Sequence, residues 1–254
     1  MRIYSFRFGI TFNFFGEGVD MKILVLSSYT KGQQYKSDNC IRFGDLEPPA
    51  RLESRIKELS GYSVPAGEMF TGPLHTQLRQ GLKQIRKHDQ YGENTLDLYF
   101  PWYDFRVDRE KIPVSENDSI VPFNITPHQN VKPLEYNDTG LLESVVTLIE
   151  GYDLVFSILR WNDIVLLQRV FEVERAATLI FLIAPSNSHV VDDSLPNVHI
   201  VEAGTNLSRA IGAMNVALNG VVLRRLCEAA CRDGFQVFEQ VKQDPQRLLE
   251  IVRR

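Results

Sequence analysis

The chain has 254 residues, of which 44% are hydrophobic and 24% charged, with a formal net charge of −4. These values are ordinary for a globular protein and exclude a disordered chain, and the length suffices for one large or two small domains. The acidic balance argues against a surface for indiscriminate phosphate binding, although it is compatible with a local basic groove. No apolar run reaches the roughly 18 residues of a membrane span, so we expect no membrane partner. Three cysteines form no disulfide framework, which predicts a reducing, cytoplasmic environment.

Residues 1–20 are rich in phenylalanine and precede Met21, which opens an apolar strand. We interpret residues 1–20 as an extension that contributes little to the fold. The alternative is an edge hairpin of residues 2–9 and 10–15. No linker or internal repeat interrupts residues 21–254, which favours a single domain there.

The first half of this domain alternates strands and helices. Apolar runs predict strands at residues 23–26 and 96–100, and a proline pair predicts a helix over 50–59. A second helix begins at Pro73, and its core-facing stripe is Leu74, Leu78, Leu82 and Ile85. Residues 101–138 contain five prolines and form a long irregular stretch, a kind of segment that is usually functional or mobile.

The second half is more regular. Apolar runs predict strands at residues 153–159, 178–184 and 198–201. Helical segments are expected at residues 141–150, 162–172, 207–212, 218–232 and 245–253. Because strands alternate with helices, the fold class is α/β: a three-layer sandwich with a mostly parallel central sheet flanked by helices.

Polar side chains follow the first strand, where open α/β sheets place their ligands. They are Ser27, Ser28, Thr30 and Lys31. Hydroxyls and a lysine at this edge are suited to holding a phosphate or a nucleobase edge, so we predict that they bind substrate. The alternative is a polar turn with a solvated lysine.

A second group of candidates surrounds the start of the helix at Pro73. Glu68 is a candidate general base, and Thr71, Gly72 and His75 are candidate substrate-binding residues, because a helix start favours an anion. The alternative is local: Thr71 caps the helix, and His75 lies on the surface or at the edge of the core.

Aromatic residues mark the irregular stretch. Trp102, Tyr103 and Phe123 are candidates for stacking on bases, and Phe123 is assigned to substrate binding. The alternative is that they anchor a long loop to the domain. Asp104 beside them is a candidate catalytic carboxylate.

No metal or cofactor is expected. The sequence contains no nucleophile elbow, dinucleotide fingerprint or zinc-ligand spacing. Cys227 and Cys231 lie four residues apart on a predicted helix and could form half of a metal site, but no second pair of ligands lies nearby. We interpret them as structural thiols.

The order of three segments resembles the YaaA-like family, often labelled peroxide stress proteins. The segments are a first strand ending in Ser27 and Ser28, the motif Pro-Ala-Gly-Glu-Met-Phe-Thr-Gly at residues 65–72, and Ile-Val-Pro-Phe at residues 120–123. A weaker similarity is to the domain of archaeosine synthase with a uracil-DNA-glycosylase-like fold. The chain departs from the family where residues 100–105 read Phe-Pro-Trp-Tyr-Asp-Phe instead of a small-residue turn.

This resemblance implies a uracil-DNA-glycosylase-like fold and a nucleobase- or nucleic-acid-processing hydrolase that cleaves an N-glycosidic bond. Such an enzyme needs an Asp or Asn after the first strand and a late His, and His189 is the better positioned late histidine. Under this hypothesis Glu68 or Asp104 activates water, and Glu68→Gln abolishes activity. The alternative is a non-catalytic nucleic-acid or nucleotide-binding protein linked to a stress response.

Overall fold

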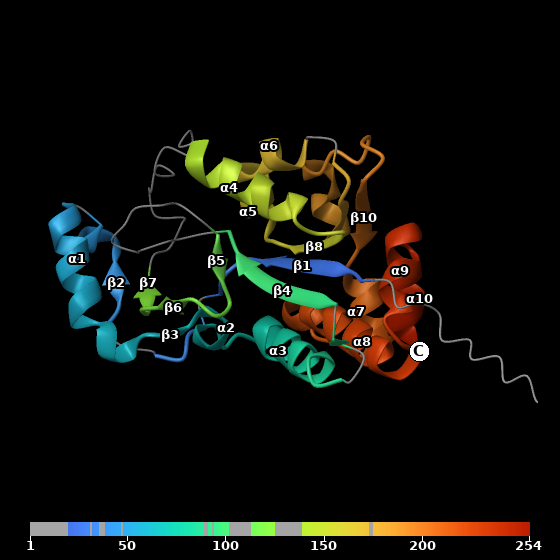
Figure 1. The fold of residues 1–254 in the computed structure, drawn as a ribbon, viewed down its shortest axis with the longest axis horizontal. Coiled ribbons are helices and arrows are strands. Elements are labelled where there is room, and N and C mark those ends of the chain that lie inside the picture. The colour runs from blue at the N-terminus through green and yellow to red at the C-terminus, as the bar shows by residue number, and fades with distance from the viewer. Residues whose placement is uncertain are drawn as a thin grey trace, which may run out of the picture.

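The computed structural model describes residues 20–30, 32–35, 39–46, 48–88, 91–92, 94–101, 113–124, 139–172 and 175–254. At its centre lies a six-stranded sheet with the strand order β10-β9-β8-β1-β4-β5 (Figure 1). All neighbouring strands run parallel except β4 and β5, which are antiparallel. The strands are β1 (Lys22–Ser27), β4 (Thr95–Phe100), β5 (Val114–Ser115), β8 (Leu154–Ile158), β9 (Thr178–Ile183) and β10 (Val198–Glu202).

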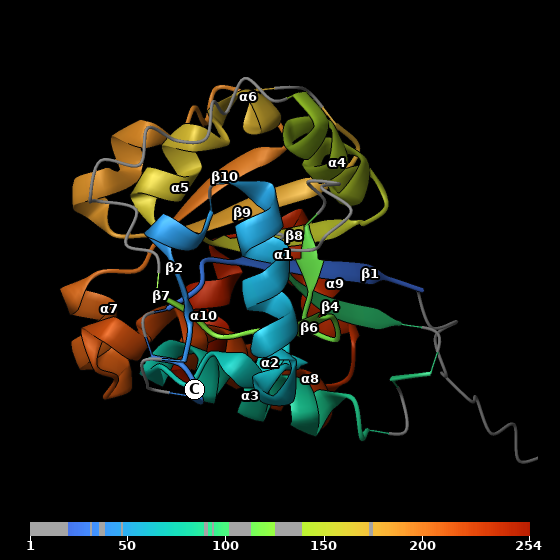
Figure 2. The same ribbon diagram turned by 90° about the vertical axis from the view of Figure 1, so that its left-hand side faces the viewer.

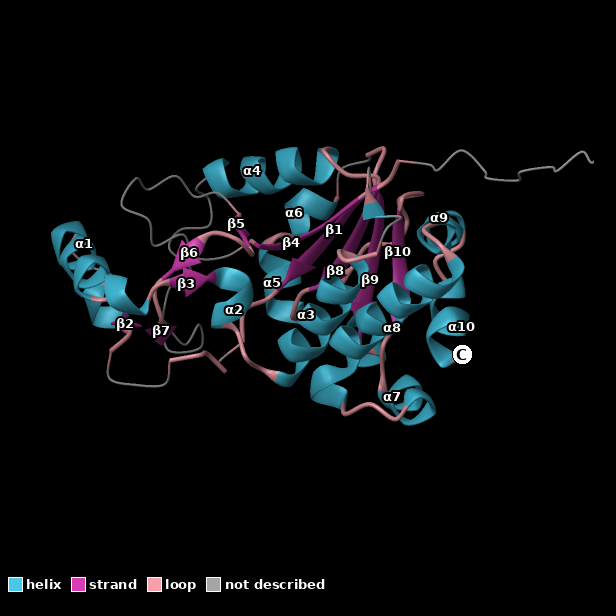
Figure 3. Ribbon diagram, turned by 60° about the horizontal axis from the view of Figure 1, so that its bottom comes forward, coloured by secondary structure: helices cyan, strands magenta, loops and turns pink. Residues whose placement is uncertain are grey.

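Helices cover both faces of this sheet, as Figure 3 shows by the cyan layers on either side of the magenta strands. On one face α3 (Pro73–Ile85) packs along α8 (Leu218–Asp233), with α7 (Thr205–Ile211), α9 (Gln236–Gln243) and α10 (Arg247–Arg253) grouped around α8. On the other face lie α4 (Thr139–Glu150), α5 (Trp161–Leu166) and α6 (Gln168–Phe171). The α/β class with a mostly parallel, helix-flanked sheet is therefore confirmed.

Burial on both faces accounts for the unbroken apolar runs of the central strands. Every residue of β8, and every residue of β1 after Lys22, is buried. A strand that meets helices on both sides gains from apolar side chains at every position, so it loses the alternation of a half-exposed strand. The stripe on α3 is confirmed for Leu78, Leu82 and Ile85, which are buried, whereas Leu74 is half-buried.

The strand order reverses at β1. From β1 the chain crosses to β4 on one side, and it later returns to β8 on the other side. β9 and β10 then extend the sheet in the direction of β8. The connections leaving the carboxyl ends of β1 and β8 therefore depart in opposite directions, which makes this edge a topological switch point.

A smaller group of elements lies beyond the carboxyl edge of the sheet (Figures 1 and 2). It contains the helix α1 (Pro49–Glu58) and two pairs of short strands. β2 (Ile41–Arg42) and β7 (Phe123–Asn124) are parallel, and β3 (Val64–Pro65) and β6 (Ser119–Ile120) are antiparallel. The short helix α2 (Ala66–Met69) follows β3 in the chain. Short 3-10 turns occupy Phe43–Asp45, Ser60–Tyr62, Pro185–Val190 and Asn215–Ala217.

Several predicted boundaries are wrong. Residues 65–71, for which no helix or strand was predicted, contain α2 and the second residue of β3, and residues 114–124 contain three two-residue strands. Strands this short have partners far along the chain, so no local periodicity announces them. The helix expected over 162–172 is two helices divided at Leu167, and α9 was not expected at all. Gly234, at a φ of 90°, separates α9 from α8.

Candidate functional site

Two adjacent serines at the end of β1 connect the two helix layers. The Ser27 hydroxyl lies 3.1 Å from Nε2 of His75 on α3. The Ser28 hydroxyl donates a hydrogen bond to Oδ2 of Asp163 on α5. Successive side chains of a strand point to opposite faces, so neighbouring residues reach opposite layers. All four side chains are buried at the switch point.

On the α5 side, Ser28, Arg160 and Asp163 form a closed set of hydrogen bonds. The Ser28 hydroxyl accepts a hydrogen bond of 2.8 Å from the backbone N–H of Arg160, while Nε of Arg160 donates to Oδ2 of Asp163 at 3.1 Å. The Asp163 side chain is 7% exposed and that of Arg160 is 40% exposed. A nearly buried carboxylate is thus held beside a guanidinium group that reaches solvent.

Arg160 also covers an aromatic ring. Its guanidinium carbon lies 4.8 Å from the ring centroid of Tyr29, which packs edge-on against Phe123 at 5.4 Å. Burial by itself would lower the pKa of Arg160, but the charge of Asp163 and the Tyr29 hydroxyl outweigh it and raise that pKa. Arg160 is therefore a fixed cation at this edge.

On the α3 side, His75 is a buried neutral base. Its Nδ1 lies 3.3 Å from the Thr30 hydroxyl, so both ring nitrogens face hydroxyl groups. Burial, and then the positive charge of Arg79, lowers the pKa of His75 to about 3. The interpretation of His75 as a surface or core-edge residue is wrong, because it lies on the buried stripe of α3, three residues before Leu78.

Close contacts join the loop after β1 to the start of α3. The Thr71 N–H donates to the Gly32 carbonyl at 2.9 Å, and a Cβ on Gly72 would lie 2.9 Å from the Thr30 hydroxyl. Gly72, not Thr71, is the N-cap residue of α3, and no side chain caps it. The capping interpretation of Thr71 is therefore wrong: its side chain is exposed, and Gly72 allows the close approach.

The structure brings together five predicted site residues. They are Ser27, Ser28, Thr30, Gly72 and His75.

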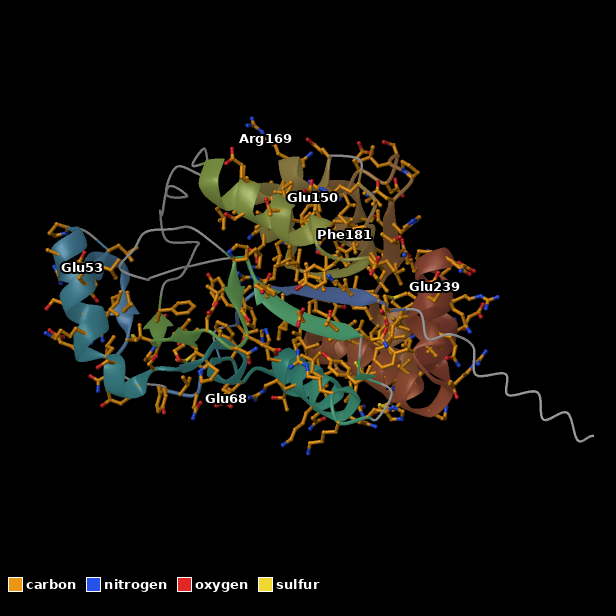
Figure 4. The ribbon with its side chains drawn as sticks, viewed as in Figure 1. Glu53, Glu68, Glu150, Arg169, Phe181 and Glu239 are labelled. Carbon is orange, nitrogen blue, oxygen red and sulfur yellow. The ribbon has the colours of Figure 1, made fainter. Side chains whose placement is uncertain are left out.

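Phe123 lies next to this cluster: it is buried in the core and packs on Tyr29, the ring that Arg160 covers. Other candidates lie apart from the cluster. Glu68 is exposed on α2 at the lower margin of the molecule (Figure 4), and His189 is exposed in the turn after β9. Lys31 and Asp104, with residues 1–19, Trp102 and Tyr103, lie outside the described residues.

Sequence analysis missed Asp163 and Arg160. A usable signal was present, because Arg160 comes just after the buried strand β8 and Asp163 lies in the first turn of the helix that follows, and polar residues there reach the carboxyl edge of the sheet.

Within the described ranges, no three His, Cys, Asp or Glu side chains are grouped as a metal ion would need. Burial raises the pKa of the Cys227 thiol to about 12, which suits a structural thiol. In the same part of the chain, no helix has the length and apolar character required to cross a membrane.

Comparison of the chain with models of protein families, with curated proteins and with solved structures finds no match.

Proposed function

We propose that the chain is a nucleobase-directed hydrolase that cleaves an N-glycosidic bond at the carboxyl ends of β1 and β8. The observation that carries the proposal is the contact between Ser28 and Asp163 at the topological switch point. The resemblance to the glycosylase-like fold implies an Asp or Asn near the end of the first strand to activate water. Residues 27–30 contain only hydroxyls, and α5 places Asp163 beside them.

In this mechanism Asp163 acts as the general base. Its Oδ2 is occupied by Ser28 and Arg160, which leaves Oδ1 to accept a proton from water. The water oxygen bonds to the anomeric carbon as the bond from carbon to base nitrogen breaks, and the base departs with the bond electrons. The base takes up a proton from solvent, and Asp163 releases to solvent the proton that it accepted from water. Ser28 and Arg160 act as positioning residues for the carboxylate.

His75 has a different part. With a pKa of about 3 it is neutral near pH 7, so it does not protonate a leaving base there. Its contacts with Ser27 and Thr30 fix the loop after β1, whose next residue is the predicted substrate-binding Lys31. The resemblance to a uracil-DNA-glycosylase-like fold supports the same reaction class and belongs to this proposal.

The test is base release, detected by mass spectrometry after incubation with nucleosides, nucleotides, single- and double-stranded DNA, and bulk tRNA. We expect Asp163→Asn to reduce the rate by about 100-fold or more, the usual range for a general base. The matched control is Asp193→Asn, an exposed carboxylate in the loop after β9, which should leave the rate unchanged. Equal rates in wild type and Asp163→Asn would remove Asp163 from the mechanism.

Glu68 is tested in the same assay. Because Glu68 is exposed on α2 and forms no hydrogen bond with the cluster, its position favours Asp163 as the base. Loss of activity in Glu68→Gln with retention in Asp163→Asn would reverse this assignment.

A second candidate function is binding without catalysis. It is favoured by the low exposure of Asp163, 7%, together with the two hydrogen bonds to its Oδ2, since both suit a structural anchor for Arg160. Retention of nucleic acid with no released base would support it. If the protein neither releases a base nor retains nucleic acid, both functions are contradicted.

A further inference from the structure

A second polar site lies between α1 and the segment of β2 with its following turn. It is an open cleft of about 560 Å³ lined by Arg42, Asp45, Arg51, Ser54, Arg55 and Glu58. We call it the arginine cleft. Four of these residues follow the spacing i, i+3, i+4 and i+7 on α1, so a single face of this helix forms one wall.

Two carboxylates contact the arginines of this cleft: Glu58 pairs with Nη1 of Arg55 at 2.8 Å, and Asp45 lies between the arginines. The Asp45 carboxylate lies 3.3 Å from Nε of Arg51 and 4.0 Å from Nε of Arg55, and it accepts a hydrogen bond of 2.9 Å from the Arg42 backbone N–H. The side chain of Arg51 is 61% exposed, and Asp45 contacts its Nε. The exposed part of this guanidinium can meet a ligand from solvent.

The charge and shape of the cleft suit a phosphate-bearing ligand. Three guanidinium groups face two carboxylates, so the lining has an excess of one positive charge in a protein whose net charge is −4. The planar fork of a guanidinium matches two phosphate oxygens at once. The cleft is many times larger than one phosphate group. Because it is open to solvent, a nucleic-acid strand can pass through it.

The position of the cleft relates it to the candidate site. Figure 2 looks toward the carboxyl edge of the sheet, with α1 standing in front of it. The carboxyl ends of β1 and β8, where Ser28 meets Asp163, lie at that same edge. A nucleic-acid strand with one base beside Asp163 would therefore extend toward α1.

We propose that the arginine cleft binds the phosphodiester backbone of a single-stranded nucleic acid, with Arg51 as its principal contact. The identity of the ligand rests on the proposed function. If a nucleobase binds beside Asp163, the phosphate in the arginine cleft belongs to the same nucleic-acid strand. The cleft itself is separate from Asp163 and Ser28, so the two sites are tested independently.

The test is fluorescence anisotropy with a labelled oligonucleotide of about ten nucleotides over a series of salt concentrations. We expect Arg51→Gln to weaken binding by about fivefold to tenfold at low salt and to reduce the salt slope by about 0.7, the value for one phosphate contact on a single strand. Arg247→Gln is the matched control. Arg247 is also half exposed, at 52%, and its Nε faces Asp244, but α10 lies on the α8 side of the sheet, away from α1.

Inorganic phosphate and a mononucleotide are measured with the same variants. Their affinities should be equal in wild type and Arg51→Gln. If they weaken as much as the oligonucleotide does, the cleft is a site for a small phosphate ligand and the strand proposal is overturned. The strand proposal is also overturned if wild type, Arg51→Gln and Arg247→Gln bind the oligonucleotide equally well. It is overturned as well if wild type does not bind the oligonucleotide. Base release from nucleosides can persist in each of these cases, so failure here is distinct from failure of the proposed function.

Discussion

Ser28 satisfies two buried polar groups with one hydroxyl. It donates to the Asp163 carboxylate and accepts from the backbone N–H of Arg160. A buried donor or acceptor that loses its partner costs more free energy than the hydrogen bond contributed on balance. Ser28 therefore matters for stability as well as for the proposed chemistry.

Replacement of Ser28 by alanine should lower the free energy of unfolding by about 1–3 kcal/mol, because the Asp163 carboxylate and the Arg160 N–H each lose a partner. Urea denaturation measures the change. Ser188→Ala is the control, since that hydroxyl donates to Pro185 in an exposed turn and should change stability little. Equal losses in the two variants would contradict the role given to Ser28.

The buried His75 makes stability depend on pH. Its folded-state pKa, about 3, lies below the ordinary value of 6.5, so the unfolded chain binds a proton first as the pH falls. The stabilising effect is complete above about pH 6.5 and is lost between pH 6.5 and 3, by about 1.4 kcal/mol for each pH unit. Urea denaturation at pH 7, 6 and 5 measures this slope.

The variant His75→Gln should remove that part of the pH dependence, whereas His189→Gln, at an exposed position, should keep it. Identical slopes in wild type and His75→Gln between pH 7 and 5 would show that other groups are responsible.

At the scale of elements, the contact between α3 and α8 depends on glycine. A Cβ on Gly81 would lie 2.8 Å from the Arg224 Cα, and a Cβ on Gly220 would run into the Leu74 carbonyl. Both obstacles are backbone atoms and cannot rotate away. The two helices therefore approach closely, and α3 is set at the depth at which His75 meets Ser27.

Gly220→Ala should separate these helices and lower the free energy of unfolding by about 1–3 kcal/mol, the usual effect of overpacking. Gly61→Ala is the control, because no atom lies within 4 Å of its added Cβ. Thermal denaturation followed by circular dichroism compares the two. A Gly220→Ala variant as stable as wild type would mean that the helices can shift freely.

The length of an element decides whether the sequence predicts it. α3 and the central strands carry long apolar patterns, since each buries one stripe or two faces, and these patterns are visible in the sequence. β3 and β6 are two residues long and stabilise each other across more than fifty positions of chain. No local pattern distinguishes such strands from loops.

For the whole molecule, one hydrophobic core extends from β1 to α10 through the described residues. It includes Ile41 and Phe123 of the β2–β7 pair, so the smaller group of elements shares the core of the sheet. A single domain at residues 21–254 stays a prediction.

Such a core predicts one cooperative unfolding transition. Far-ultraviolet circular dichroism and tryptophan fluorescence, to which Trp161 beside the candidate site contributes, should give the same midpoint in urea. An earlier transition seen by one probe only would indicate that the elements beyond the carboxyl edge unfold separately.

The sequence by itself determined the fold class and the first half of the candidate site. Long apolar runs and a helical stripe are local patterns, and the rule that ligands lie after parallel strands pointed to Ser27, Ser28 and Thr30. Only the tertiary structure decided which groups meet these hydroxyls. Ser28 and Asp163 are 135 residues apart, and Ser27 and His75 are 48 apart. Their pairing depends on the strand order at β1 and on the alternation of side chains across the sheet, which brings one serine to each helix layer.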